Sequence, residues 1–449
     1  MKRILLAIAI ELLTTNRYAS AGPLEDGEDA VQRRDYSTAL KLFQPLAEKG
    51  NSIAQTNLGV MFAEGDGVTK NYLEAARLFR LAAAQGVPMA QFSLGVLYEE
   101  GEGVSRDYSE ASKWYKLAAE QGNAPAQAHL AAQYQLGQGV TQDLTEALRL
   151  NRMAAAQGFA QAQYNLARQY ELGQGIAQDY AEALKLYQLA AKQGEKAAQY
   201  SLGLMYVRGL AGPSDSLEAL KWFRLAAAQG DSFAQNNIGV IYQNGNGVAQ
   251  DFDEALKWYR LSAAQGNASA QSNLAQMLEH GQGVPQDYAG AARLYQLAAA
   301  QGYAMAQTKL GFMYIQGMGV KQDYPEAVKW SKLAAAQGVP EAQHNLGEHY
   351  RQGLGVAQNN AEAVKWYRLA ARNGYLESQV NLGLMYQYGL GVKQDNLRAL
   401  MWFRLSGKSG LARSTEAAEI IAKKMTQEDV AQAYKMAQEC QQAQFKNCD

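Results

Sequence analysis

The stretch that decides the fold is residues 94–127, which read LGVLYEEGEGVSRDYSEASKWYKLAAEQGNAPAQ. Leu94 and Tyr98 share one face of a first predicted helix, because residues three and four apart are neighbours on a helix surface. The glycines that follow end this helix, since glycine tolerates the backbone angles of a turn. Asp107 is positioned to cap a second helix, and Gly122 is a C-terminal stop. The stretch therefore predicts two helices joined by a tight loop.

The same pattern recurs every 36 residues along the chain. With Asn51 as repeat position 1, 37 of the 42 glycines fall at only four repeat positions. The last glycine of each repeat marks the period: Gly50, Gly86, Gly122, Gly158, Gly194, Gly230, Gly266, Gly302, Gly338, Gly374 and Gly410. Two short helices cannot bury their faces alone, so repeats of this length stack. The sequence predicts an all-α protein, a right-handed α/α solenoid of antiparallel helix pairs, with ten repeats over 51–410.

Composition excludes several other classes of protein. The 449 residues are 48% hydrophobic, with 42 basic and 43 acidic side chains and only two cysteines. Such a chain is too apolar for disorder and too poor in cysteine for a disulfide scaffold. It has no basic excess, so we expect no nucleic-acid partner. No run of about 18 apolar residues exists, so we also expect no membrane span.

The N-terminal segment resembles a secretory signal. Lys2 and Arg3 precede the apolar stretch Ile4–Ile10, and Ala19–Ala21 offers a cleavage site of the A-x-A type. Residues 1–21 are therefore predicted to be a signal peptide, and the mature protein to be periplasmic or secreted. Glu11 interrupts the apolar stretch, which leaves open an amphipathic first helix of the solenoid.

The two ends of the array differ from the repeats between them. Residues 22–50 align only in part with a repeat and are predicted to form a degenerate N-terminal helix pair. The period is lost after Gly410, and residues 411–449 are predicted to form C-terminal capping helices. Cys440 and Cys448 lie in this last segment. In an exported protein they would form a disulfide, but two free thiols are an equal alternative because spacing does not reveal geometry.

The repeat resembles a known family. The pattern LGxxYxxGxGVxxDYxEAxKWYxxAAxQGxxxAQ, found in Leu94–Gln127 and repeated over the array, is similar to the Sel1-like repeat, a relative of the tetratricopeptide repeat. The resemblance implies a solenoid that binds other proteins. By analogy with tetratricopeptide proteins, the first helices would line a concave groove that contacts ligands.

The motifs that could indicate catalysis, phosphate binding or metal binding lack the residues or the structural context that these functions require. Gly407-Lys408-Ser409 ends a helix, whereas a phosphate-binding loop follows a strand. His344 and His349 are five residues apart and do not share a helix face, as two metal ligands would. No serine or cysteine has an identifiable base. We therefore predict no catalytic site, no metal and no cofactor.

Two surfaces of the repeat stand out. Basic residues recur at repeat positions 27 and 30 on the second helix, and a glutamate at position 24 is expected to pair with position 27. Positions 4, 8, 12, 25, 31 and 32 barely change between repeats, which we attribute to packing. Positions 3, 6, 10 and 13 vary freely and share one face of the first helix.

The variable face supplies the candidate groove residues. Its apolar members would anchor a peptide and its polar members would confer specificity; the alternative is that some of them pack against adjacent repeats. The candidates are Met89, Phe92, Val96, Arg168, Tyr200, Leu204, Met305, Phe312, Ile315, His344 and Glu348.

These observations favour an exported, non-catalytic scaffold that binds another protein or a peptide segment in its groove. The first alternative is a subunit of an envelope assembly for exported polysaccharide, which some exported family members resemble. The second is a β-lactam-binding hydrolase, an activity attributed to relatives. The third is a cytosolic chaperone or signalling adaptor, which would require an uncleaved leader.

Overall fold

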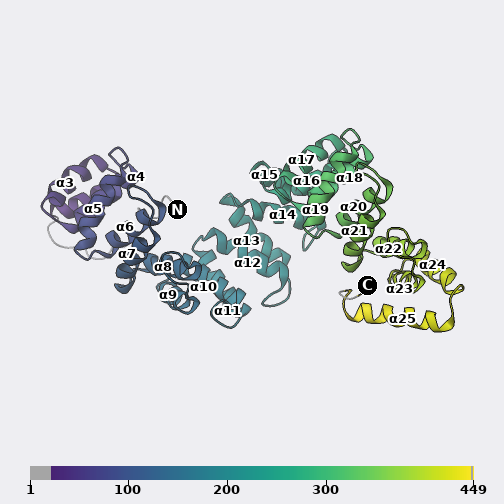
Figure 1. Ribbon diagram of the computed structural model, residues 1–449. Coiled ribbons are helices and arrows are strands. Elements are labelled where there is room, and N and C mark those ends of the chain that lie inside the picture. The colour runs from purple at the N-terminus through teal and green to yellow at the C-terminus, as the bar shows by residue number, and fades with distance from the viewer. Residues whose placement is uncertain (1–21, 446–447, 449) are drawn as a thin grey trace. The chain divides into compact units, whose positions relative to one another are not determined.

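The computed structural model describes residues 22–445 and 448, and this part of the chain contains helices and no strands (Figure 1). The 24 helices of the described residues are α2 (Pro23–Gln32), α3 (Tyr36–Glu48), α4 (Ser52–Glu64), α5 (Tyr72–Ala84), α6 (Pro88–Glu100), α7 (Tyr108–Glu120), α8 (Ala124–Leu136), α9 (Leu144–Ala156), α10 (Ala160–Leu172), α11 (Tyr180–Lys192), α12 (Lys196–Arg208), α13 (Ser216–Ala228), α14 (Ser232–Asn244), α15 (Phe252–Ala264), α16 (Ala268–His280), α17 (Tyr288–Ala300), α18 (Ala304–Gln316), α19 (Tyr324–Ala336), α20 (Pro340–Gln352), α21 (Asn360–Arg372), α22 (Leu376–Tyr388), α23 (Asn396–Lys408), α24 (Ala412–Ala422) and α25 (Gln427–Gln442). The predicted signal peptide, residues 1–21, lies outside the described residues.

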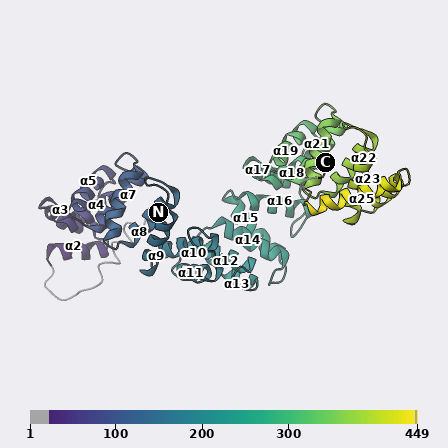
Figure 2. The same ribbon diagram turned by 60° about the horizontal axis from the view of Figure 1, so that its bottom comes forward.

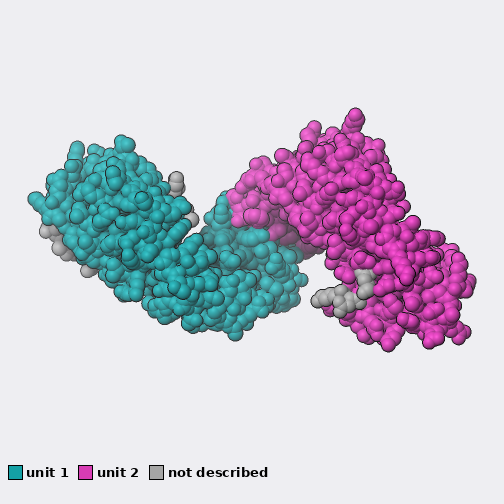
Figure 3. Space-filling model, in the orientation of Figure 1, with its two compact units in different colours: residues 1–229 teal, residues 230–449 magenta. Residues whose placement is uncertain are grey.

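The chain forms two compact units, residues 1–229 and residues 230–449 (Figure 3). The first unit contains α2–α13 and the second contains α14–α25. Within each unit, the first helix of a pair packs against its own second helix and against the second helix of the preceding pair. The predicted all-α solenoid of paired helices with a 36-residue period is therefore confirmed.

The helix boundaries fall where the sequence predicts them. Asp107 Oδ1 accepts the backbone N–H groups of Ser109 at 2.9 Å and Glu110 at 3.0 Å, which caps α7. The first helix α6 ends at Gly101, whose φ of 74° is left-handed. Gly103, with a φ of 70°, lies so close to α5 that a Cβ there would be 2.2 Å from the carbonyl oxygen of Tyr72. Glycine is therefore required at this position by both its φ angle and its packing.

A ladder of glutamine side chains joins successive repeats. Gln91 Nε2 donates to the carbonyl oxygen of Ala83 in the last turn of the preceding second helix, and Gln121 Nε2 donates to Gln91 Oε1 at 2.8 Å. Carbonyl groups in the last turn of a helix have no partner within the helix; the Ala83 carbonyl accepts both the backbone N–H of Gly86 and the Gln91 amide. The same side-chain pair, at repeat positions 5 and 35, recurs as Gln85–Gln55, Gln157–Gln127, Gln193–Gln163, Gln229–Gln199, Gln265–Gln235, Gln301–Gln271, Gln337–Gln307 and Asn373–Gln343.

The core of most repeats is built from alanines, leucines and one large side chain at repeat position 29, which is Asn151 or Ser331 in the two exceptions. This residue is buried and aromatic in most repeats, as in Tyr115 and Phe223. Its ring lies against the glycine at repeat position 9: a Cβ on Gly95 would be 2.6 Å from a ring carbon of Tyr115. The small residue predicted at position 9 therefore makes room for an aromatic ring from the second helix.

The basic residues at repeat position 27 form ion pairs on the helix surface, as expected. Eight glutamates at position 24 pair with them, three residues apart on an exposed face, where such pairs contribute little to stability. The pairs are Glu74–Arg77, Glu110–Lys113, Glu146–Arg149, Glu182–Lys185, Glu218–Lys221, Glu254–Lys257, Glu326–Lys329 and Glu362–Lys365.

Helices α24 and α25 occupy the segment predicted to close the solenoid, and both pack against α23 (Figures 1 and 2). Cys440 near the end of α25 forms a disulfide with Cys448. No helix among the described residues is both long and apolar enough to cross a membrane.

Candidate functional site

The variable face of the first helices, which we call the first-helix face, is formed by side chains at repeat positions 3, 6, 10 and 13. The structure leaves the candidates at this face accessible to different degrees. Met305 is 49% exposed, Phe312 is 39% exposed, and Arg168 is also exposed. The remaining candidates, apart from Phe92, are half-buried: Met89, Val96, Tyr200, Leu204, Ile315, His344 and Glu348.

Phe92 requires a correction, because it is only 1% exposed and cannot contact a ligand. Its ring centroid lies 5.8 Å from that of Tyr115 and 5.4 Å from that of His129 on the next first helix. Aromatic rings at this separation attract one another beyond their burial. Phe92 is thus a core residue, as the packing alternative had allowed for some members of this face.

Buried tyrosines at repeat position 29 set the floor of the first-helix face. Each ring belongs to a second helix, but its hydroxyl reaches an acceptor on the first helix. Tyr115 donates to Glu99 Oε2 at 2.6 Å, and Tyr259 donates to Gln243 Oε1 at 2.6 Å. The same bond joins Tyr187 to Glu171 and Tyr295 to Glu279. All four acceptors are at repeat position 13, so this position anchors the second helix to the face.

These tyrosines remain protonated donors. Burial raises the pKa of Tyr115 far above its ordinary value, and the neighbouring Glu99 carboxylate raises it further. Burial is also the main reason for the raised pKa values of Tyr187, Tyr259, Tyr295 and Tyr367. A neutral phenol in this environment serves to position a carboxylate and is poorly suited to act as a base.

In the first unit the acceptor carboxylate belongs to a three-residue cluster. Glu99 Oε2 is 3.0 Å from His129 Nδ1 and also accepts the hydroxyl of Tyr115. Burial favours the protonated form of Glu99, but the hydrogen bond and charge of His129 and the bond from Tyr115 outweigh burial. The pKa of Glu99 is consequently lowered, and the cluster presents a carboxylate fixed between two helices.

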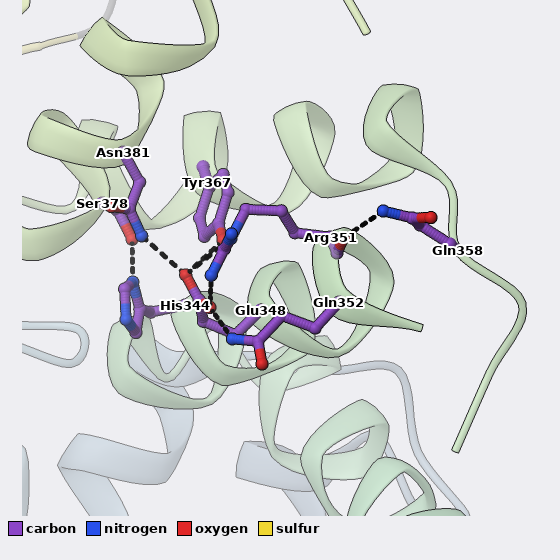
Figure 4. A network of polar contacts seen from close by, with 8 residues as sticks. All are labelled: His344, Glu348, Arg351, Gln352, Gln358, Tyr367, Ser378 and Asn381. Carbon is purple, nitrogen blue, oxygen red and sulfur yellow. Dashed lines mark hydrogen bonds and ion pairs between the residues drawn. The ribbon is translucent and has the colours of Figure 1, made fainter. Parts of the chain in front are cut away.

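In the second unit the corresponding cluster is larger and is centred on Glu348 (Figure 4). Arg351 occupies position 13 in this repeat, so Tyr367 donates to Glu348 at position 10. Arg351 Nη2 lies 2.6 Å from Glu348 Oε2, and Asn381 Nδ2 on the next first helix donates to Oε1 at 2.7 Å. Burial raises the pKa of Glu348, but the bonds from Arg351, Tyr367 and Gln352 outweigh it and lower the pKa. Glu348 is therefore held ionised.

His344 lies beside this cluster on the same helix. Its Nδ1 is 2.9 Å from the hydroxyl oxygen of Ser378, and its ring centroid is 5.7 Å from that of Tyr367 and 5.0 Å from that of Tyr375. Burial lowers the pKa of His344, which favours the neutral ring. The predicted shared face of His344 and Glu348 is present, but the hydrogen-bond partner of His344 is on the following repeat.

The face combines fixed polar groups with exposed apolar side chains, which suits binding. Among the described residues, no group of three or more histidine, cysteine or acidic side chains is placed to hold a metal ion. Phe233, at position 3 of its repeat and 60% exposed, was not among the candidates. It shares its repeat position with Met89 and Met305, so the period alone would have identified it.

Comparison with known proteins agrees with this geometry. The Sel1 repeat family matches residues 17–51, 52–87, 88–123, 124–159, 160–195, 196–231, 232–267, 268–303, 304–339, 340–375 and 376–411. The first of these eleven matches includes the segment predicted to be a degenerate pair. No curated protein matches the chain.

Two solved structures resemble the chain over long stretches. A protective antigen present in uropathogenic Escherichia coli strains, which displays an SLR fold, is 35% identical, with a TM-score of 0.80. That match covers 94% of this chain and 92% of the antigen. A Sel1 repeat protein from Oxalobacter formigenes is 30% identical, with a TM-score of 0.51, over 54% of this chain and 97% of that one.

Proposed function

The chain belongs to the Sel1 repeat family, and from this premise we propose that it is an exported, non-catalytic scaffold whose first-helix face binds an extended segment of a partner protein. The coarser part of this statement, a Sel1-repeat scaffold, follows from the family. The surface, the kind of ligand and the location are our proposal.

One observation carries the choice of surface. In the second unit, the exposed side chains of Phe233, Met305 and Phe312 lie on the first helices α14 and α18. The fixed Glu348 cluster is on the later first helices α20 and α22 of the same unit. Apolar side chains that gather on an exposed face with polar groups around them indicate an interaction site. Aromatic anchors beside rigidly held charges are the usual composition of a peptide-binding surface.

The polar clusters support recognition because their charges are already held in place. Glu348 is oriented by Arg351, Tyr367 and Asn381 before any ligand arrives. A ligand that contacts this carboxylate would not have to order a flexible side chain, which reduces the entropic cost of binding. We expect the bound segment to place polar groups beside the Glu348 cluster and apolar side chains near Phe312.

Export is supported by the N-terminal sequence, in which basic residues, an apolar stretch and the site Ala19–Ala21 follow one another. The similar Escherichia coli protein is a protective antigen, which agrees with an exported location. Mass spectrometry of the protein recovered from the producing cell provides the test. A mature chain that begins at Gly22 is expected; an intact Met1 in a cytosolic fraction would contradict the proposal.

Photo-crosslinking in cells tests the proposed surface. A benzophenone amino acid replaces Phe312 or Met305, and a matched control replaces Lys321, which is exposed in the loop after α18. We expect the same partner protein to be joined at both face positions and to be missing at Lys321. Equal labelling at Lys321, or labelling at neither face position, would contradict the proposal. With the partner purified, Phe312→Ala should weaken binding about tenfold or more, as truncation of a binding anchor does.

A further inference from the structure

The second helices carry a regular row of apolar side chains that the sequence analysis attributed to packing, and the structure corrects this. At repeat position 31, nine successive repeats have a leucine or methionine that is between 39% and 55% exposed. In the first unit these are Leu81, Leu117, Met153, Leu189 and Leu225; in the second they are Leu261, Leu297, Leu333 and Leu369. We call them the outer leucine row. Positions 27 and 35, which flank the row on the same helices, are basic and amide residues in these nine repeats, so the row is an apolar strip between polar side chains. A single exposed leucine is ordinary, but the same exposed apolar position in nine repeats is a patterned surface.

The tenth repeat shows how this surface is covered. Its residue at position 31, Leu405, is only 5% exposed because α24 and α25 pack on α23. Position 27, which is basic in the other repeats, is Met401 and is 1% exposed. Both residues share a hydrophobic cluster with Ala433 and Ala437 of α25. Where a helix covers the row, the basic residue at position 27 is thus replaced by an apolar side chain.

The polar contacts around Leu405 also indicate what the covering helix provides. The guanidinium group of Arg404, at position 30, lies 4.6 Å from the ring centroid of Tyr434. Lys408 Nζ donates to Gln441 Oε1 at 3.1 Å. The bases beside the row therefore meet an aromatic ring and an amide oxygen on α25. In the second unit, position 30 is Arg260, Lys332 or Arg368 in three of the four uncovered repeats and Gln296 in the other, so most of the uncovered row has a basic border.

In the first unit, the outer leucine row begins at a cavity of about 510 Å³ formed by residues of α3, α4, α5 and the loop after α4. Its apolar lining includes Leu40, Phe62, Leu78 and Leu81, and Arg77 and Glu74 also border it. A cavity of this size accommodates a large apolar side chain, the kind of anchor that dominates helix-in-groove binding.

We propose that the outer leucine row is a second interaction surface, which docks an amphipathic helix of a partner protein in the way that α25 docks on α23. The helix has an alanine- or leucine-rich apolar face, and carboxylates beside that face meet the basic border. This surface is on the second helices and is independent of the proposed function of the first-helix face.

The test uses a synthetic peptide with the sequence of residues 427–442, in which Cys440→Ala removes the thiol and a benzophenone replaces Met436. This peptide carries carboxylates at Glu428, Asp429 and Glu439. After irradiation with the intact protein, mass spectrometry locates the adducts. We expect them on second helices along the row, and we expect a control peptide with lysine at the three carboxylates to give at least tenfold fewer.

A variant with Leu297→Ser, Leu333→Ser and Leu369→Ser makes the result specific. The replaced side chains are half-exposed, so the fold should persist, and circular dichroism checks this. Adducts in the second unit should fall at least tenfold, whereas adducts on the unchanged row of the first unit serve as the internal control. Adducts confined to α23, labelling of the first helices, or adducts unaffected by the leucine changes would overturn the proposal. Leucine-dependent self-association of the chain without peptide labelling would assign the row to a second copy, and would also overturn it.

Discussion

Two stretches of the first unit fill the same repeat positions with opposite chemistry. In α8–α10, repeat positions 11 and 29 hold Gln133, Asn151 and Gln169, and all three are buried. In α12–α13 the corresponding residues are Met205 and Phe223. Both stretches nevertheless have 13-residue helices, with a left-handed glycine after the first helix (Gly137 or Gly209) and a capping aspartate before the second (Asp143 or Asp215). The boundaries of the repeat therefore depend on its capping and turn residues, and the identity of the core side chain is a separate variable.

The buried side-chain amides of the polar stretch form hydrogen bonds, but some of their polar atoms have no partner in the part of the chain that the structure describes. Ser112 donates to Gln133 Oε1 at 2.6 Å, and Asn151 Nδ2 donates to Gln169 Oε1 at 3.0 Å. Gln133 Nε2, Asn151 Oδ1 and Gln169 Nε2 have no partner among the described residues. A buried polar group without a partner costs about 1–3 kcal/mol. We call these four residues the polar seam and expect it to be the least stable part of the first unit.

The largest effect is expected when a polar side chain like that of the seam is placed in the core of the apolar stretch α12–α13. Phe223→Asn removes a fully buried ring that lies against Gly203, and it leaves a polar amide in the space. We expect the free energy of unfolding to fall by about 3–5 kcal/mol, because large-to-small changes in a core create a cavity. Native-state hydrogen exchange at α12–α13 measures the local free energy of unfolding. The matched control is Leu225→Asn at a half-exposed position, which should cost much less. A loss below about 1 kcal/mol for Phe223→Asn would mean that the repeat collapses around the missing ring.

The second test concerns the carboxylate beside the seam. Glu99→Ala leaves the buried hydroxyl of Tyr115 without its acceptor, so we expect the free energy of unfolding to fall by about 1–3 kcal/mol. In α12–α13 the same two positions hold Val207 and Phe223, which need no hydrogen bond. The double variant Glu99→Ala/Tyr115→Phe imitates that pair and should be more stable than Glu99→Ala alone. Urea denaturation of four proteins, the wild type, Glu99→Ala, Tyr115→Phe and the double variant, measures the coupling, and strictly additive effects would show that the bond contributes nothing.

The third test repairs the seam. Gln133→Met, Gln169→Met and Asn151→Leu together remove every unpartnered amide atom while retaining similar volumes. The single hydroxyl proton of Ser112 can then go to the carbonyl oxygen of Tyr108, which lies 2.8 Å from Oγ. We expect a gain of about 1–2 kcal/mol, since replacing a partly satisfied buried network by apolar groups is neutral or stabilising. Gln169→Met alone should be destabilising, because it removes the partner of Asn151. No change in the melting temperature of the triple variant would contradict the assignment of the seam as a weak point.

The smallest expected effect is a difference in acid sensitivity. The pKa of Glu99 is lowered, because the contacts with His129 and Tyr115 outweigh burial. A carboxyl whose pKa is lower in the folded state stabilises the fold above its ordinary pKa, and this stabilisation is lost as the pH falls through the lowered value. The α6–α8 region should therefore open in acid more readily than α12–α13, where Val207 and Phe223 do not titrate. Local hydrogen exchange at neutral and acidic pH measures this, and Glu99→Gln should remove most of the difference. Equal acid sensitivity of the two regions would contradict it.

Much of the architecture could be predicted because the repeat is local in sequence. Asp107, Gly101 and Gly122 act within a few residues of their positions, so their spacing predicts the helix boundaries directly. Glutamate and basic residues three apart on one helix are also local, and their ion pairs formed as expected. The family follows from the same local pattern.

The candidate site was predicted less completely because it depends on contacts between repeats. Phe92 was assigned to the groove, but its neighbours Tyr115 and His129 come from other helices and bury it. Leucine at position 31 was attributed to packing, although it is half-exposed until α25 covers Leu405. A helical period reports which residues share a face, but it does not report what stands opposite that face.

By itself, the sequence determined the helix pairs, their period and the residues that begin and end them, because caps and turns act over three or four residues. Only the tertiary structure decided which side chains of each face reach solvent. The hydroxyl of the position-29 tyrosine, for example, donates to Glu99 in the repeat of Tyr115 and to Glu348, at a different repeat position, in the repeat of Tyr367. Such hydrogen bonds join buried polar groups of different helices, so the sequence of a single helix does not reveal which acceptor is used.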